Sequence, residues 1–236
     1  MTYEISSDER FAGSLGYIMR RMTGEAECEL VKSESRHVLR ISTKIDIAGN
    51  LSDCIADIVI TDCKTYYINE RIKLPIGDNL VACAFTSALS TFDRDTDKII
   101  AKTLIRLTPQ INLDSFYEFG LYVLKSRWDE VCLLANENRC YLLCQSTFME
   151  LLRFLISNID GMCDEAHIVM NGERLEVLGG GLKPIENIYI NDSLPNDIQI
   201  VNKLVVLAPK RIFLHTANDA LKDSIQNIFG TCTVVN

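Results

Sequence analysis

The segment from Leu113 to Ile159 constrains the fold of this chain most strongly, because it carries two long apolar stripes. Side chains that recur every three or four residues lie on one face of an α-helix, and such a face must be covered. We therefore expect two long central helices that pack on each other. The first stripe is Tyr117, Leu121, Leu124, Trp128, Val131 and Ala135, and the second is Tyr141, Cys144, Phe148, Leu151 and Leu155.

The starts of these helices are marked by two short motifs. Ser115 followed by Glu118, and Thr147 followed by Glu150, match the capping box in which two side chains bind the free amides of a helix start. Because Trp128 lies within the first stripe, we expect its ring to be buried between the two helices.

The chain before this segment divides into a mixed unit and a helical region. Residues 1–48 predict a strand at 2–5, a helix from Ser7 and a hairpin of strands at 26–30 and 36–42. The stripe of that first helix is Phe11, Leu15, Ile18 and Met22. Further helices are predicted from Asn50, from Asp78 and from Asp95 or Thr96, so that residues 49–160 form a helical centre. The third of these should bury Ile100, Leu104 and Leu107.

Residues 161–236 return to alternating patterns. The dipeptide Asn171-Gly172 joins two apolar runs and is a strong hairpin signal. A helix from about Asn196, a strand at 211–215, a helix capped by Asn218 and a last strand at 231–235 follow. The sequence thus predicts an α+β protein, with a central helical bundle flanked by a βαββ unit and a ββαβαβ unit, which could share one sheet.

Composition narrows the classes of function. A net charge of −8 argues against nucleic-acid binding, which depends on Lys and Arg. No apolar run approaches the ~18–20 residues of a membrane helix, and the N-terminus has no signal core, so we expect a cytoplasmic protein. The nine cysteines lie mostly in apolar patterns and are interpreted as reduced, buried thiols. We expect no cofactor.

One group of residues has the composition of a metal site. Cys140 and Cys144 form one pair with a spacing of four, and Cys163 and His167 form another. Four such ligands would suit tetrahedral zinc. However, Cys144 falls on the predicted core stripe, and His167 falls in a predicted strand. Packed thiols and a packed histidine are therefore the preferred interpretation, with the zinc site as a weak candidate.

A second class of site remains open near the C-terminus. The run Gly179-Gly180-Gly181 follows a strand, as a phosphate-binding loop would, but Lys183-Pro184 comes next instead of a helix start. A crevice formed by these glycines and His215 would make the chain a small-molecule or nucleotide-binding enzyme. We keep this as the alternative function.

Several motifs resemble those of the YtxC family of sporulation proteins. Leu113, Asp114, Phe116 and Phe119 match one segment, Phe148, Leu151, Leu152 and Phe154 match a second, and His167 lies at a strand position that follows. The closing stretch from Leu207 to Gly230 is also similar to that family. The resemblance runs from about Leu51 to the C-terminus. It departs at Gly120, where a basic residue is usual, and at Tyr122.

The resemblance implies a role in spore formation and no particular reaction. Together with the charge and the motifs, it favours a non-enzymatic cytoplasmic protein that acts through an unidentified protein partner. The best candidate for an interaction surface is Phe116, Phe119 and Val123, which project away from the stripe of Tyr117. The oligomeric state is not predicted by the sequence.

Overall fold

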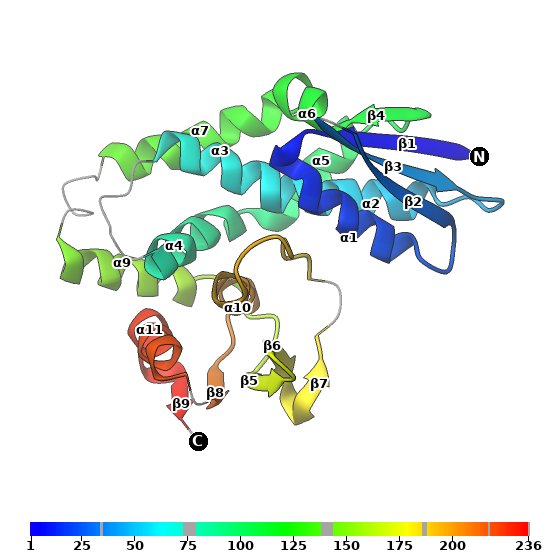
Figure 1. The fold of residues 1–236 in the computed structure, drawn as a ribbon. Coiled ribbons are helices and arrows are strands. Elements are labelled where there is room, and N and C mark those ends of the chain that lie inside the picture. The colour runs from blue at the N-terminus through cyan, green and yellow to red at the C-terminus, as the bar shows by residue number, and fades with distance from the viewer. Residues whose placement is uncertain (34, 73–78, 138–143, 186–187, 217, 236) are drawn as a thin grey trace. The chain divides into compact units, whose positions relative to one another are not determined.

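The computed structural model describes the chain except residues 34, 73–78, 138–143, 186–187, 217 and 236 (Figure 1). The protein is α+β, as predicted. It divides into two compact units, the first formed by Met1–Tyr67 with Asp93–Glu130 and the second by Ile68–Phe92 with Val131–Asn236. Each unit has its own sheet, so the expectation that the two ends of the chain share one sheet is wrong.

The sheet of the first unit has the strand order β2-β3-β1-β4. Its strands are β1 (Thr2–Ser7), β2 (Glu27–Ser33), β3 (Arg36–Ser42) and β4 (Gln110–Asn112). The predicted hairpin of β2 and β3 is confirmed, and β1 lies antiparallel to β3. The sequence did not predict β4, which pairs in parallel with β1, because three residues are too few to show an alternating pattern.

The helices of the first unit begin with a 3-10 turn, η1 (Glu9–Phe11), and α1 (Ala12–Met22). The whole predicted stripe of α1 is buried. The remaining elements are α2 (Ala48–Ile58), α5 (Arg94–Leu104) and the short α6 (Leu113–Ser115). The predicted helix starts were wrong in detail. α2 begins at Ala48, before the predicted Asn50, and Asp46 accepts a hydrogen bond from the amide of Ala48. The cap of α6 is Asn112, which accepts from the amide of Ser115, and not Ser115 itself.

Two π-helical turns interrupt the long helices of this unit. η2 (Val59–Cys63) joins α2 to α3 (Lys64–Arg71), and η3 (Phe116–Gly120) precedes α7 (Tyr122–Glu137). A step of four residues rotates an α-helical stripe by about 40°. The wider π turn takes up an extra residue and reverses this drift. A stripe with a constant spacing of four therefore remains buried throughout: Leu51, Ile55, Val59 and Cys63.

The sheet of the second unit has the order β7-β6-β5-β8-β9. Its strands are β5 (Glu165–Asn171), β6 (Arg174–Gly179), β7 (Lys183–Pro184), β8 (Arg211–His215) and β9 (Thr233–Val235). The hairpin of β5 and β6 turns at Gly172, whose φ of 62° is easy for glycine. β8 is parallel to both β5 and β9.

The helices of the second unit lie on one side of this sheet (Figure 1). They are α4 (Asn79–Thr91), α9 (Gln145–Ser157), α10 (Asn196–Leu207) and α11 (Asp219–Phe229). α10 connects β7 to β8, and α11 connects β8 to β9, so both connections run toward the β9 side of the sheet. Because such connections between parallel strands are right-handed, both helices lie on the same face. The predicted cap of α11 is confirmed, because Asn218 accepts from the amide of Leu221.

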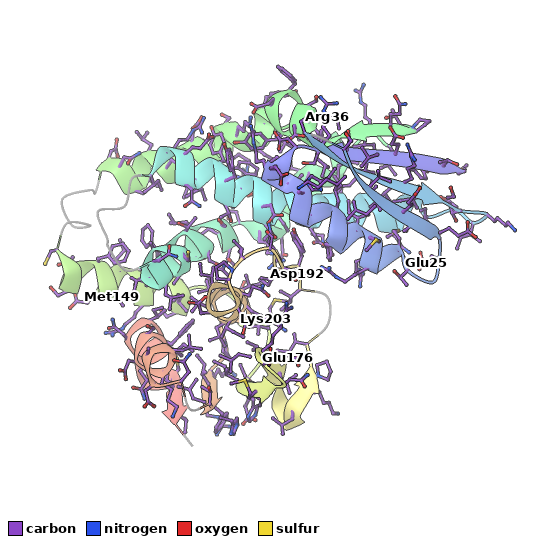
Figure 2. The ribbon with its side chains drawn as sticks, in the orientation of Figure 1. Glu25, Arg36, Met149, Glu176, Asp192 and Lys203 are labelled. Carbon is purple, nitrogen blue, oxygen red and sulfur yellow. The ribbon has the colours of Figure 1, made fainter. Side chains whose placement is uncertain are left out.

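The outer edge of β6 is occupied by side chains from α10. The carboxamide of Asn196 bonds both the amide and the carbonyl of Leu175, at 2.9 and 3.0 Å, as a neighbouring strand would. Lys203 donates to the carbonyl of Val177 at 3.1 Å. Figure 2 labels Lys203 on α10 and Glu176 on β6. Since an exposed strand edge invites pairing with another chain, these bonds protect this edge.

The central helices differ from expectation in their neighbours. Trp128 is buried, as predicted, with 1% of its surface exposed. Its ring packs against Tyr67 of α3, and its indole nitrogen donates to Asp97 of α5, so these shorter helices supply neighbours that the sequence did not predict. Cys144 is exposed instead of buried, because α9 begins only at the next residue. On α5, Asp97 and Ala101 are buried, whereas the predicted core residues Ile100, Leu104 and Leu107 are only half-buried.

Candidate interaction site on the C-terminal sheet

The second face of the five-stranded sheet carries the most distinctive cluster of the molecule. β5 and β8 pair with His167 opposite Phe213 and Val169 opposite His215. Because successive side chains of a strand point to opposite faces, these four residues lie on the same face. The residues between them, Ile168, Ile212 and Leu214, are fully buried beneath the helices. The alternating direction of side chains along β5 and β8 therefore places one set of residues in the core and the other set in this cluster.

The two histidines form a direct hydrogen bond. Nδ1 of His167 lies 3.0 Å from Nε2 of His215, and the ring planes differ by 12°. The ring centroids are 5.3 Å apart, which exceeds the distance between the two bonded nitrogens by about one ring width. The two rings therefore meet edge to edge, with these nitrogens facing each other. One ring must donate its N–H and the other must accept. The bond therefore cannot survive with both rings protonated.

An aromatic ring and an ion pair complete the cluster. Phe213 lies beside His167 with ring centroids 4.6 Å apart and planes within 10°. The guanidinium of Arg211 lies 5.9 Å from the centroid of Phe213 and forms an ion pair with Glu165. Glu165 also approaches Nε2 of His167, at 3.9 Å. These neighbours leave only 14% of the His167 side chain exposed, so the ring is held in place.

The rest of this face has an apolar centre and charged ends. Val169, Leu178 and Phe213 are half-buried, and Val234 is exposed. Arg174 and Glu176 lie at the end of β6 near the hairpin turn, while Glu165 and Arg211 lie at the opposite end of the sheet. Its strands therefore carry one acid and one arginine at each end. The face is electrically neutral in a chain of net charge −8.

The structure tests the weak zinc candidate only in part. Cys140 lies outside the described residues. Cys144 is exposed just before α9, Cys163 is partly buried before β5, and His167 is bonded to His215. In the part of the chain that the structure describes, no group of three or more His, Cys, Asp or Glu is arranged to hold a metal ion.

The glycine run and His215 do not lie together. Gly179 ends β6 opposite Ala166, near the start of β5, whereas His215 pairs with Val169 toward its end. Gly180 begins a 3-10 turn, η4 (Gly180–Leu182), and faces the carboxylate of Glu165. A cavity of about 550 Å³ at this turn is lined by Asp164, Glu165, Gly180, Lys210 and Arg211. The predicted crevice would therefore need residues from opposite ends of the sheet.

The predicted interaction surface in the first unit is partly exposed. Phe119 has 81% of its surface exposed, while Phe116 and Val123 are half-buried. The ring of Phe116 lies over Gly120, where an added Cβ atom would come within 2.3 Å of it. A glycine at this position, where the resembling family has a basic residue, thus accommodates the Phe116 ring.

Sequence reasoning treated the three histidines separately and missed the pair. No local signal pairs them, because β6, β7 and α10 lie between β5 and β8 in the chain, so the order of the elements does not make β5 the neighbour of β8. Only the register decides which side chains then meet. None of the described helices is long and apolar enough to cross a membrane. No family model, curated protein or solved structure matches this chain.

Proposed function

We propose that this protein is a non-enzymatic binding protein whose main contact surface is the open face of the C-terminal sheet. The observation that carries the proposal is the one-sided arrangement of the second unit. Its described helices cover one face of the sheet, and the other face displays His167, Phe213 and His215. A face with a half-buried aromatic centre and a charged rim has the anatomy of a protein–protein interface.

The surface is also ordered before any partner arrives. The rings of His167 and Phe213 lie nearly parallel, and the His167–His215 bond fixes the edge of the cluster. Side chains that are already held lose little rotamer freedom on binding. This favours a docking surface over a set of unrelated exposed side chains.

We further propose, from the YtxC resemblance, that this binding serves spore formation inside the cytoplasm and does not involve nucleic acid. The support consists of the matching motifs, among them His167, and of the acidic charge. A strain without the gene should grow normally and form fewer or defective spores. A strain that sporulates at the normal rate but fails to grow would refute this role.

A second surface is proposed on the strength of one observation, the exposure of Phe119. An aromatic side chain with 81% of its surface exposed, next to the exposed Tyr122, forms an apolar patch on the first unit. The sequence predicted Phe116, Phe119 and Val123 as this surface, and we propose that the half-buried Phe116 and Val123 border the exposed Phe119.

Two matched variants distinguish the surfaces. Phe213→Asp places a charge at the centre of the sheet face, and Phe119→Asp does the same on the first unit. Tagged wild-type and variant chains would be used to recover partners from sporulating cells, with circular dichroism as the check on folding. If the sheet face is the main contact surface, only Phe213→Asp should lose the partner. Loss with Phe119→Asp alone would assign the contact to the first unit.

A further inference from the structure

The partner of the open sheet face can be identified from the charges on that face. We infer that the face binds a second copy of the same chain, so that two C-terminal sheets pack face to face in a symmetric dimer. This inference rests on the proposed function, because it uses the same surface. It specifies the partner, which the sequence and the resemblance leave open.

The first argument is electrostatic. Two chains that each carry a net charge of −8 repel each other wherever their acidic surfaces meet. The strands of the open face carry two carboxylates and two guanidinium groups, Glu165, Glu176, Arg174 and Arg211, and are neutral. Two copies can therefore approach through this face at a lower electrostatic cost than through an average part of the surface.

The second argument is symmetry. Glu165 and Arg211 lie at one end of the strands, and Glu176 and Arg174 lie toward the other. Consider a two-fold axis that lies in the plane between the two sheets and runs perpendicular to their strands. It places the strand ends with Glu165 and Arg211 in one copy against the strand ends with Glu176 and Arg174 in the other. Each acid can then meet an arginine of the second copy. Such self-complementarity is what an isologous dimer interface requires.

The third argument concerns the centre of the face. Residues near the dyad would meet their own counterparts, so the centre must tolerate contact with itself. Phe213, Val169, Leu178 and Val234 are apolar, and aliphatic and aromatic side chains pack against copies of themselves. Stacked sheets lie about 10 Å apart, which leaves room for interdigitated rings of this size. The bonds from Asn196 and Lys203 to β6 disfavour strand pairing with a second chain at that side of the sheet.

The test is the mass of the purified full chain in solution. Light scattering after gel filtration should give twice the chain mass of 26.6 kDa at tens of micromolar protein, with dissociation on dilution. Arg174→Glu changes only an exposed side chain at the rim and should weaken the dimer at least tenfold. Phe213→Asp should give monomers. Arg40→Glu is the matched control, since Arg40 is an exposed strand arginine on the sheet of the first unit and should leave the dimer intact.

Each other result has a definite meaning. A wild-type chain that stays monomeric at about a hundred micromolar overturns the dimer. So does a dimer that both Arg174→Glu and Phe213→Asp leave unchanged, because it must form elsewhere. Co-expression of two differently tagged copies completes the test: failure of one tag to recover the other also contradicts the inference. If Phe213→Asp then still abolishes capture of a different protein, the proposed docking face stands and only the identity of its occupant was wrong.

Discussion

Nζ of Lys64 lies 2.8 Å from Oδ2 of Asp97, and both side chains are only 1% exposed. The same carboxylate accepts from the indole nitrogen of Trp128 at 2.9 Å and from Nε of Arg127 at 3.2 Å. One buried aspartate thus holds α3, α5 and α7 together in the first unit. Burial lowers the pKa of the Lys64 amino group, and the Asp97 carboxylate opposes that shift.

Asp97→Ala should destabilise the protein by about 3–5 kcal/mol, because it leaves a buried ammonium group without its carboxylate. Urea denaturation followed by circular dichroism measures the loss. Asp53→Ala is the control, since Asp53 pairs with Lys102 on the surface, where such a bridge contributes about 0–1 kcal/mol. Equal losses in the two variants would show that the buried pair contributes no more than a surface one.

The same variant should regain stability as the pH rises. A lysine whose pKa is lowered by folding binds fewer protons in the folded chain than in the unfolded chain. Stability therefore increases with pH between the lowered value and the ordinary value of about 10.4. Asp97→Ala lowers the folded value further and widens this window. Its deficit relative to wild type should shrink from about pH 7 to about pH 10. A deficit that stays constant would contradict the assignment to Lys64.

Trp128→Ala should cost about 3–5 kcal/mol, because it empties a packed aromatic site next to Tyr67. Trp128→Phe keeps most of the volume but removes the donor to Asp97, and should cost about 1–3 kcal/mol. This is the only tryptophan, so fluorescence reports on it alone. Emission typical of a water-exposed indole in the native protein would contradict its burial.

Gly120→Ala should destabilise the first unit by about 1–3 kcal/mol, since the new Cβ would overlap the ring of Phe116 and force it to move. Gly49→Ala is a matched control within α2, where an added Cβ meets nothing within 4 Å. It should stabilise the protein by about 0.4–1 kcal/mol. Thermal unfolding of both variants decides the matter, and a neutral Gly120→Ala would show that Phe116 moves without cost.

Cys144 should be the most reactive of the described thiols. The hydroxyl of Ser146, and then the amide of Thr147, stabilise its thiolate and lower its pKa to about 7. Burial instead raises the pKa of Cys54 to about 11. Alkylation followed by mass spectrometry should label Cys144 rapidly with a half-maximal rate near pH 7, and Cys54 only after unfolding. Ser146→Ala should slow the labelling of Cys144 at neutral pH; an unchanged rate would rule out the Ser146 contribution.

Local features of this fold could be predicted from the sequence because they depend on the spacing of residues close together in the chain. The stripe of Phe11, Leu15, Ile18 and Met22 is buried as predicted, since helical geometry alone places these residues on one face. The hairpin at Asn171-Gly172 and the cap at Asn218 follow from the preferences of one or two residues. Helix starts were less predictable, because Asn112 and Asp46 compete with neighbouring polar residues for the same free amides.

Tertiary structure alone decided which distant residues meet. Asp97 looks like a solvated residue of a polar helix, and only the approach of α3 and α7 makes it the acceptor for Lys64 and Trp128. His167 and His215 each fit an ordinary strand pattern, and they are 48 residues apart. Their hydrogen bond exists because β5 and β8 pair in one particular register. A shift of one residue would turn one of the histidines into the core. Periodicity fixes the face on which a side chain lies, whereas its partner is set by packing between elements, which no local pattern encodes.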